Sequence, residues 1–404
     1  SAPGVAAVPA APRPALPQAG SLRADQVAAM LAALNESEAH GFPADAFNQV
    51  AIAQALTGAR EPARKAEAQA RLITATLAYA RAVHVGRLPE RNFPRDWGLR
   101  PPAYDAQAEF ARAVAQDRVA QWLAELPPSY PGYRTLQQGL TRYRMLAAAG
   151  GWPRVTAGPE LKLGDQGTRV QELRARLNAE DPDTPAEGDL YDQPLVDAVI
   201  RAQKRYGLEP HGRLDRATTS ALNVPVERRV EQIEANMERW RWLPARLPEN
   251  RIQVNIAAAV LTLFENDQPT MSMRAATGRP NDKTPMLSSE IHSIVLNPPW
   301  NVPTSIANGE LWPKERAEPG HLARNGFRVI PLEGGGSRLQ QAPGANNALG
   351  RVKFDFENPY SVFLHDTPGR TVFERFGRLV SHGCVRLQRP VPLAKKLLEG
   401  DPTW

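Results

Sequence analysis

The sequence predicts a multidomain α+β protein with a helical region, a three-helix module and a mainly β C-terminal domain that carries an insertion. The chain has 404 residues, more than one hydrophobic core usually serves. Before about residue 250, apolar residues recur at helical spacing. After Asn250 they alternate with polar residues in short runs separated by turn residues, which is typical of strands. A composition of 42% hydrophobic and 23% charged residues excludes a wholly disordered chain, a collagen-like fibre and a coiled-coil rod.

The helical region is expected over residues 21–158. Helical spacing is clear in one group, Leu72, Leu77 and Tyr79, and in a second, Leu136, Leu140, Tyr143 and Leu146. Gly150-Gly151 followed by Pro153 is a strong stop signal for the last of these helices. Residues 1–20 contain five prolines among alanines and are expected to form a disordered tether.

A compact module is expected over residues 159–225. Its first helical stripe holds Val170, Leu173 and Leu177, its second holds Val196, Val199 and Ile200, and Asp215 to Leu222 fit a short third helix. A charged helical segment over residues 226–249 then connects the module to the β-rich part and ends at Pro244 and Pro248.

The C-terminal domain is expected over residues 250–404. Alternation in Ile252, Val254 and Ile256 marks the first strand, and further strands fit Val260 to Leu263, Met271 to Met273, Ile291 to Leu296, Val352 to Phe356 and Ser361 to Leu364. Residues 301–349 are poor in periodicity and contain the triglycine Gly334-Gly335-Gly336. We expect this stretch to be an insertion that caps the sheet, and the triglycine favours a mobile cap.

Charge and cysteine content exclude several classes of function. The 49 basic and 43 acidic residues give a net charge of +6, and without a run of five basic residues the pattern predicts no nucleic-acid binding. The apolar runs fall short of the roughly 18 residues that cross a bilayer, so we expect no membrane span. The single cysteine, Cys384, excludes an internal disulfide and a multi-cysteine metal site.

Cys384 is the candidate nucleophile. The run Ser381-His382-Gly383-Cys384-Val385-Arg386 places an imidazole and a guanidinium within two residues of the sulfur, a setting expected to lower the pKa of the thiol. A second histidine, His365, precedes the cysteine by 19 residues at the end of an expected strand, and a cysteine with a histidine from another element is the minimal pair for acyl transfer. The amides of Gly383 and Cys384 are natural donors to an oxyanion.

These residues carry a family resemblance. The run Ser381 to Leu387, with His365 before it, resembles the active-site signature of L,D-transpeptidases of the YkuD type, which remodel bacterial peptidoglycan. Thr277-Gly278-Arg279, Thr284-Pro285 and Leu296 to Pro303 resemble the earlier strands and loops of that family. Leu161 to Asp165, Tyr206-Gly207-Leu208 and Ala221-Leu222-Asn223 resemble a peptidoglycan-binding module. Gly150 to Pro153 and Asn236 to Trp242 resemble connecting segments of the large branch, which adds a helical scaffold and a capping subdomain.

The resemblance implies a residue-by-residue mechanism. Cys384 would attack the carbonyl of the third, diamino-acid residue of a tetrapeptide stem, expel D-alanine and hold the stem as a thioester. His365 would accept the thiol proton and later activate an acceptor amine, oriented by the backbone carbonyl of Asp366 or, as an alternative, by the Asp366 side chain. An acceptor amine from another stem would give a cross-link between two third residues. No metal or organic cofactor is implied.

Neighbouring residues leave alternatives open. His382 is expected either to position the thiolate or the oxyanion loop or to make a purely structural hydrogen bond. Arg386 would bind a substrate carboxylate or brace its loop by a salt bridge. Ser381 is a candidate for substrate contact, although a local backbone partner is the favoured interpretation.

Three aromatic or polar positions are further candidates for the substrate pocket. Phe363 stands where related sequences often carry tyrosine, and it either lines the pocket or belongs to the strand core. Trp300 and Asn301 follow two prolines and could line the donor pocket, with a buried core tryptophan as the alternative. His292 and His321 lack partners at ligand spacing and are expected to be structural or exposed, and His211-Gly212 is expected to form a turn.

Three classes of function compete. The favoured one is the L,D-transpeptidase, with an L,D-carboxypeptidase as the variant in which water resolves the thioester. A zinc peptidase is disfavoured because no His-Glu-x-x-His run is present, and a noncatalytic peptidoglycan-binding adaptor is disfavoured by the retained Cys384 and His365. The module would either hold polymer or dock the scaffold.

Location and partners follow from the implied substrate. Peptidoglycan lies outside the cytoplasmic membrane, so we expect a periplasmic protein whose export signal has been removed. The expected partners are donor and acceptor stems, and β-lactams of the carbapenem kind as covalent inhibitors. We expect a monomer.

Overall fold

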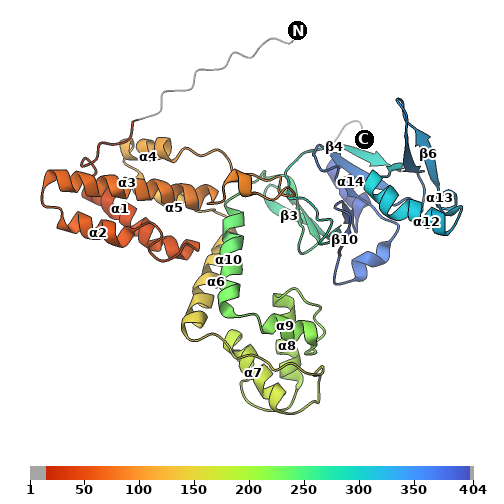
Figure 1. The fold of residues 1–404 in the computed structure, drawn as a ribbon, viewed down its shortest axis with the longest axis horizontal. Coiled ribbons are helices and arrows are strands. Elements are labelled where there is room, and N and C mark those ends of the chain that lie inside the picture. The colour runs from red at the N-terminus through yellow and green to blue at the C-terminus, as the bar shows by residue number, and fades with distance from the viewer. Residues whose placement is uncertain (1–14, 401–404) are drawn as a thin grey trace, which may run out of the picture. The chain divides into compact units, whose positions relative to one another are not determined.

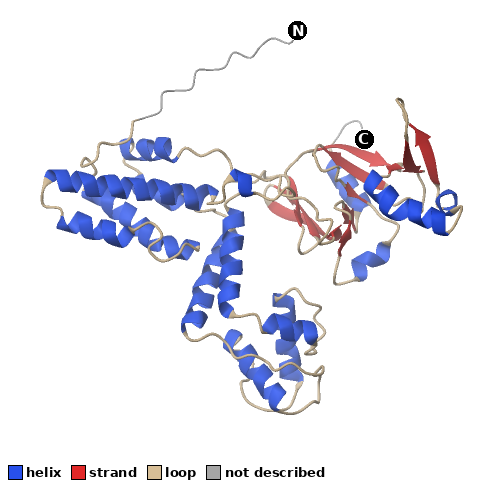
Figure 2. Cartoon of the chain, in the orientation of Figure 1, coloured by secondary structure: helices blue, strands red, loops and turns tan. Residues whose placement is uncertain are grey.

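The computed structural model describes residues 15–400, so most of the expected tether lies outside the described residues. The described chain divides into two compact units. The first contains the chain up to Phe93, residues 100–202 and residues 211–246; the second contains residues 94–99, residues 203–210 and the chain from Leu247. The N-terminal part is helical, and the strands begin in the C-terminal part, as the colours of Figures 1 and 2 show. None of the described helices is long and apolar enough to cross a membrane.

The N-terminal helices surround one hydrophobic core. Leu72 and Tyr79 lie in it on α3, together with Met30 and Leu34 of α1 and Trp122 of α5. The helices and helical turns are α1 (Ala24–Asn35), η1 (Glu36–His40), α2 (Gln49–Gly58), α3 (Pro62–Val85), η2 (Glu90–Asn92), α4 (Ala106–Ala115) and α5 (Val119–Glu125). Pro62 stands at the start of α3, where its missing amide hydrogen costs no hydrogen bond.

Two long helices pack against each other after this core. They are α6 (Pro131–Ala148) and α10 (Val226–Trp240), and Tyr133, Leu140 and Met237 are buried between them. The expected stop signal follows α6 directly, because Gly150 and Gly151 both take the left-handed backbone that glycine adopts readily.

The module consists of three helices: α7 (Thr168–Glu180), α8 (Gln193–Arg205) and α9 (Arg216–Leu222). Val170, Leu173, Leu177 and Val199, all placed on apolar faces by their spacing, are buried. Asp215 caps α9, since its side chain accepts a hydrogen bond of 2.7 Å from the Thr218 amide. The predicted class, a helical region and a helical module followed by a mainly β domain, is confirmed.

The second unit contains the large sheet. Its strands are β1 (Arg251–Asn255), β2 (Val260–Glu265), β3 (Gln268–Gly278), β4 (Ile291–Leu296), β8 (Val352–Phe356), β9 (Leu364–His365), β10 (Leu379–Ser381) and β11 (Val385–Leu387). The order is β1-β2-β3-β11-β9-β8-β4, and β10 pairs with β3. Leu364, Phe354 and Leu387 point to one face and form a core with Leu393 of α14 (Pro390–Leu398). A helical turn, η4 (Arg370–Glu374), follows β9.

The last expected strand is shorter than the sequence suggested. Ser361 has a φ of 55°, a left-handed conformation that a strand cannot contain, and β9 begins only at Leu364. The Asn358 side chain explains the turn, because its oxygen accepts hydrogen bonds from the amides of Tyr360 and Val362.

The segment between β4 and β8 has regular structure and its own core. It contains β5 (Trp300–Asn301), α11 (Thr304–Ile306), the π-helical turn η3 (Ala307–Leu311), α12 (Trp312–Ala317), α13 (His321–Arg324), β6 (Phe327–Pro331) and β7 (Ser337–Gln341). The three strands form a second sheet in the order β5-β7-β6, and Val302, Leu311 and Leu339 are buried. The triglycine lies in the turn of the β6–β7 hairpin, not at either end of the segment, so it provides no hinge there.

Candidate active site

Cys384 lies in the tight turn between β10 and β11. The preceding Gly383 has a φ of 114°, a backbone conformation that side-chain-bearing residues rarely adopt. Ser381 closes the turn: its buried hydroxyl donates to the Cys384 carbonyl at 2.5 Å and accepts from the Gly383 amide at 3.2 Å. The hydroxyl of Ser381 therefore serves the backbone of the turn, and the Gly383 amide already has a partner that an oxyanion would have to replace.

Thr284 holds the same turn from the other side. Its hydroxyl donates to the Gly383 carbonyl at 2.8 Å and accepts from the Gly278 amide at 2.8 Å. Gly278 is required at this point, because a Cβ there would lie 2.2 Å from the Asp282 carbonyl oxygen. The end of β3 and the turn that carries Cys384 are thus joined through one hydroxyl.

His365 is buried at the end of β9, with 5% of its surface exposed. Its Nδ1 donates a hydrogen bond of 2.5 Å to the carbonyl oxygen of Asp366. This contact fixes the tautomer and leaves Nε2 as the proton acceptor. The Asp366 side chain points elsewhere, accepting from the Arg351 amide and from Arg370, each at 2.9 Å.

Strand register brings the candidate pair to one face of the sheet. Arg386 of β11 pairs with His365 of β9, and His365 pairs with Lys353 of β8. Cys384 directly precedes β11, and its sulfur accepts a hydrogen bond from the Phe363 amide and is acted on by the charges of Lys353 and Arg386, which lie on the His365 face. The opposite face is apolar and packs on α14.

Burial dominates the electrostatics of the pair. It raises the pKa of the Cys384 thiol above its ordinary value, while the Phe363 amide and the charges of Lys353 and Arg386 act in the opposite direction. The expectation that nearby cations lower the thiol pKa is wrong for this state, because the loss of solvation is the larger effect. Burial, together with the charge of Arg386, lowers the pKa of His365 to about 3. The resting pair is therefore a neutral thiol and a neutral imidazole.

His382 points to the insertion. Its Nε2 donates to Oε1 of Glu310 at 2.6 Å, and Glu310 lies in the π-helical turn η3. Arg279 lies 3.7 Å from the same carboxylate oxygen, and its amide donates to the Ser381 carbonyl at 3.0 Å. π-Helical turns are rare and are frequent at functional sites. His382 thus links the turn that carries Cys384 to the insertion.

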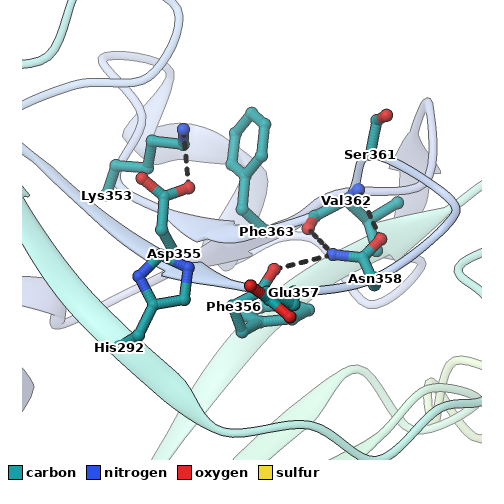
Figure 3. A pocket seen from close by; sticks show the side chains of 9 residues that line it. All are labelled: His292, Lys353, Asp355, Phe356, Glu357, Asn358, Ser361, Val362 and Phe363. Atoms are coloured by element: carbon teal, nitrogen blue, oxygen red, sulfur yellow. Dashed lines mark hydrogen bonds and ion pairs between the residues drawn. The ribbon is translucent and has the colours of Figure 1, made fainter. Parts of the chain in front are cut away.

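Arg386 and Phe363 flank the base. Within residues 15–400 Arg386 makes no ion pair, so no salt bridge braces the loop from this side chain. The Phe363 ring lies 5.5 Å from the His365 ring and lines a cavity of about 440 Å³ (Figure 3). Phe363 thus lines a cavity next to the base, and its place in a substrate pocket stays a prediction.

Trp300 and Asn301 belong to the insertion's own sheet and core. The Trp300 ring packs edge-on against Phe327 at 6.1 Å, and the Asn301 side-chain oxygen accepts from Gln340 at 2.8 Å. Their role in a donor pocket stays a prediction.

Among the other histidines, His292 lines the cavity beside Phe363, His321 lies 3.6 Å from Glu318, and His211 lies 3.3 Å from Asp215.

Sequence reasoning missed four residues that the structure places at the site. Thr284 belongs to the Thr284-Pro285 motif, which by itself predicts no contact, and Glu310 lies in a segment without periodicity. Lys353 and Asp355 are the polar residues that alternate with apolar ones in β8. This alternation could have predicted that both side chains point away from the hydrophobic core. Within the described part of the chain, no group of three or more His, Cys, Asp or Glu side chains could hold a metal ion.

The fold and site define a mainly β domain that presents a cysteine and a tautomer-fixed histidine on one sheet face. Residues 249–404 match the family described as the L,D-transpeptidase catalytic domain, of the YkuD type. Residues 13–140 match the scaffold domain, and residues 166–222 match the "Putative peptidoglycan binding domain". The C-terminal part of the chain is therefore an L,D-transpeptidase catalytic domain of the YkuD type, preceded by a scaffold domain and a peptidoglycan-binding module.

Individual proteins match only parts of this chain. A protein of Haemophilus influenzae described as "Putative L,D-transpeptidase" is 30% identical over 186 residues, which cover 42% of this chain and 37% of that protein. The match thus spans little more than a third of that relative's length. Among solved structures, the Ldtfm-avibactam carbamoyl enzyme shares 10% identity at a TM-score of 0.24, covering 43% of this chain and 59% of the other. An L,D-transpeptidase from Xylanimonas cellulosilytica shares 17% identity at a TM-score of 0.17, covering 61% and 94%.

Proposed function

We propose that this protein cross-links peptidoglycan stems by cysteine-dependent acyl transfer. The observation that supports the proposal is that Cys384 directly precedes β11, which pairs with the strand that carries His365, while the hydrogen bond of His365 Nδ1 leaves Nε2 to accept a proton. A buried neutral imidazole beside a thiol suits a reaction in which the proton moves as the bond forms.

In the acylation step, the Cys384 sulfur attacks the carbonyl carbon of the third stem residue. The thiol proton passes to His365 Nε2, and the resulting imidazolium is stabilised by the Asp366 carbonyl. The negative charge on the substrate oxygen would be received by the amides of Gly383 and Cys384, with the Gly383 amide leaving Ser381. Collapse of the tetrahedral intermediate expels D-alanine, whose amine takes the proton from His365.

In the second step, an amine of an acceptor stem attacks the thioester. His365 removes the amine proton and Cys384 leaves as the thiol. Arg386, half-buried beside His365, is a suitable partner for a carboxylate of either stem. If water replaces the amine, the same site gives an L,D-carboxypeptidase.

The experiment that tests the proposal follows product and enzyme together. The protein and its Cys384→Ala variant are incubated with a disaccharide tetrapeptide, and D-alanine, dimer and protein mass are measured by mass spectrometry. Release of D-alanine with a dimer, absent in the variant, supports the transpeptidase. Release without a dimer identifies the carboxypeptidase, and an absence of both release and acyl adduct favours the noncatalytic adaptor.

Three further assignments rest on the same proposal. The protein acts outside the cytoplasmic membrane, where peptidoglycan lies. The module over residues 166–222 contacts the polymer, which retention of module-deleted protein on purified sacculi would test. Carbapenem β-lactams acylate Cys384, because their ring carbonyl can take the place of the stem carbonyl.

A further inference from the structure

The cavity beside the active site contains an ion pair that takes no step in the acyl transfer, although the Lys353 charge acts on the Cys384 thiol. Lys353 Nζ lies 2.6 Å from Asp355 Oδ1, and both side chains are about a quarter exposed, at 23% and 25%. They lie in the cavity of about 440 Å³ that Phe363 and His292 also line (Figure 3). The pair is therefore accessible to a ligand but partly removed from water, where charge interactions are stronger than at an open surface.

Strand register places this pair next to the reacting groups. Lys353 pairs directly with His365, so both side chains point to the same face of the sheet. Asp355 follows two residues later on β8 and shares that face. Lys353 Nζ lies 4.4 Å from the centre of the Phe363 ring, which in turn lies 5.5 Å from the His365 ring. The cation is thus within about 10 Å of the base.

The charges indicate what the cavity accepts. Lys353 offers hydrogen-bond donors to a carboxylate, and Asp355 offers acceptors to an ammonium group. Glu357 also lines the cavity. The two carboxylates outnumber the one lysine, so the formal charge of the cavity is negative and a purely anionic ligand is disfavoured. A ligand with both an amine and a carboxylate can pair with both Asp355 and Lys353. A ligand with only one charge would pair with one of them and leave the other without a partner.

We propose that Lys353 and Asp355 bind the zwitterionic end of the donor stem's third residue, a diamino acid whose side chain ends in both an amine and a carboxylate. This inference rests on the proposed function. The reach is suitable, because a side chain of four carbon–carbon bonds places its terminus roughly 6 Å from the backbone that Cys384 attacks. The Phe363 ring lies next to both His365 and Lys353, where it could support the methylene chain.

Matched donor stems test the proposal. Three tetrapeptides are compared: one with diaminopimelate, one with the side-chain carboxylate of that residue amidated, and one with lysine. We expect kcat/KM for D-alanine release to be about tenfold higher with free diaminopimelate than with the other two. Lys353→Met keeps an unbranched apolar chain next to Phe363 and should abolish this preference. Lys395→Met, an exposed lysine of α14, is the control and should keep it.

Asp355 gives a second, independent measurement. All three stems carry the terminal amine, so Asp355→Asn should raise KM for all of them. Calorimetric binding of the stems to Cys384→Ala separates the inference from the proposed function, because it needs no turnover. A preference in binding that Lys353→Met removes supports the inference even without catalysis. Turnover of all three stems with equal kcat/KM, or a preference that persists in Lys353→Met, overturns it and leaves the transpeptidase intact.

Discussion

Glu310 of the insertion and His382 of the catalytic turn are 72 residues apart in the chain and 2.6 Å apart in the structure. His382 is followed by Gly383 and Cys384, so this contact lies in the turn that holds the nucleophile. The Glu310 carboxylate thereby links the insertion to the catalytic turn, and Arg279 lies 3.7 Å from the same oxygen.

Breaking this contact should affect large substrates more than small reagents. Glu310→Ala removes the acceptor of His382, and because both side chains are partly exposed we expect a two- to fivefold loss, about 0.5–1 kcal/mol, in kcat/KM for the stem donor. Alkylation of Cys384 by iodoacetamide should change little, since that reagent needs no contact with the insertion. Steady-state kinetics and alkylation rates measure the two effects.

Glu333→Ala is the matched control for this change. Glu333 is an exposed glutamate of the same insertion, next to the triglycine turn. Its removal should leave both rates unchanged. Equal losses in the two variants, or no loss in Glu310→Ala, would show that the Glu310–His382 contact does not position the catalytic turn.

A second prediction concerns Thr284. Thr284→Val keeps the shape of the side chain but removes the hydrogen bonds to the Gly278 amide and the Gly383 carbonyl. We expect the free energy of unfolding of the catalytic domain to fall by about 1–3 kcal/mol and Cys384 acylation to slow. Denaturant unfolding and mass-detected acylation by a carbapenem measure this, with the exposed Thr371→Val as control. An unchanged acylation rate in a destabilised variant would show that Thr284 stabilises the fold but does not position Cys384.

The pH dependence of Cys384 reactivity gives a third prediction. Burial raises the thiol pKa, and the charges of Lys353 and Arg386 lower it in part. The alkylation rate of the wild type should therefore keep rising through pH 9, and Arg386→Met should move the profile to higher pH. A rate that reaches its plateau below pH 7 would instead reveal a preformed thiolate and imidazolium, contrary to the neutral pair described above.

The strands near the start of the domain were predictable because their information is local. Ile252 and Val254 alternate with polar residues, and β1 covers them as expected. The pairing of β11 with both β3 and β9 is not local, since Arg386 meets Ala276 on one side and His365 on the other. Such pairings are decided by which faces can be buried together, and periodicity within one segment does not encode that choice.

The candidate site divides in the same way. Cys384 and His365 could be identified because their residue types and spacing form a specific pattern. The partner of His382 could not, because Glu310 comes from a segment whose helical turns show no periodicity in sequence. The thiol pKa was predicted in the wrong direction because charged neighbours are visible in the sequence, whereas the burial that outweighs them is a property of the folded sheet.

The last prediction concerns acid stability, and it follows from His365. Its pKa is lowered to about 3 in the folded protein from an ordinary value of about 6.5, so the unfolded chain binds the proton more readily. The stability that this histidine contributes is complete above pH 6.5 and is lost as pH falls toward 3, at up to about 1.4 kcal/mol per pH unit. His365→Gln cannot titrate, so the protection of the β9 and β11 amides from hydrogen exchange, corrected for intrinsic rates, should fall less between pH 7 and 5 than in the wild type. His40, whose pKa burial lowers to about 4, titrates in both proteins and cancels in the comparison. An equal loss of protection in wild type and His365→Gln would contradict the lowered pKa and show that the fold does not hold His365 neutral.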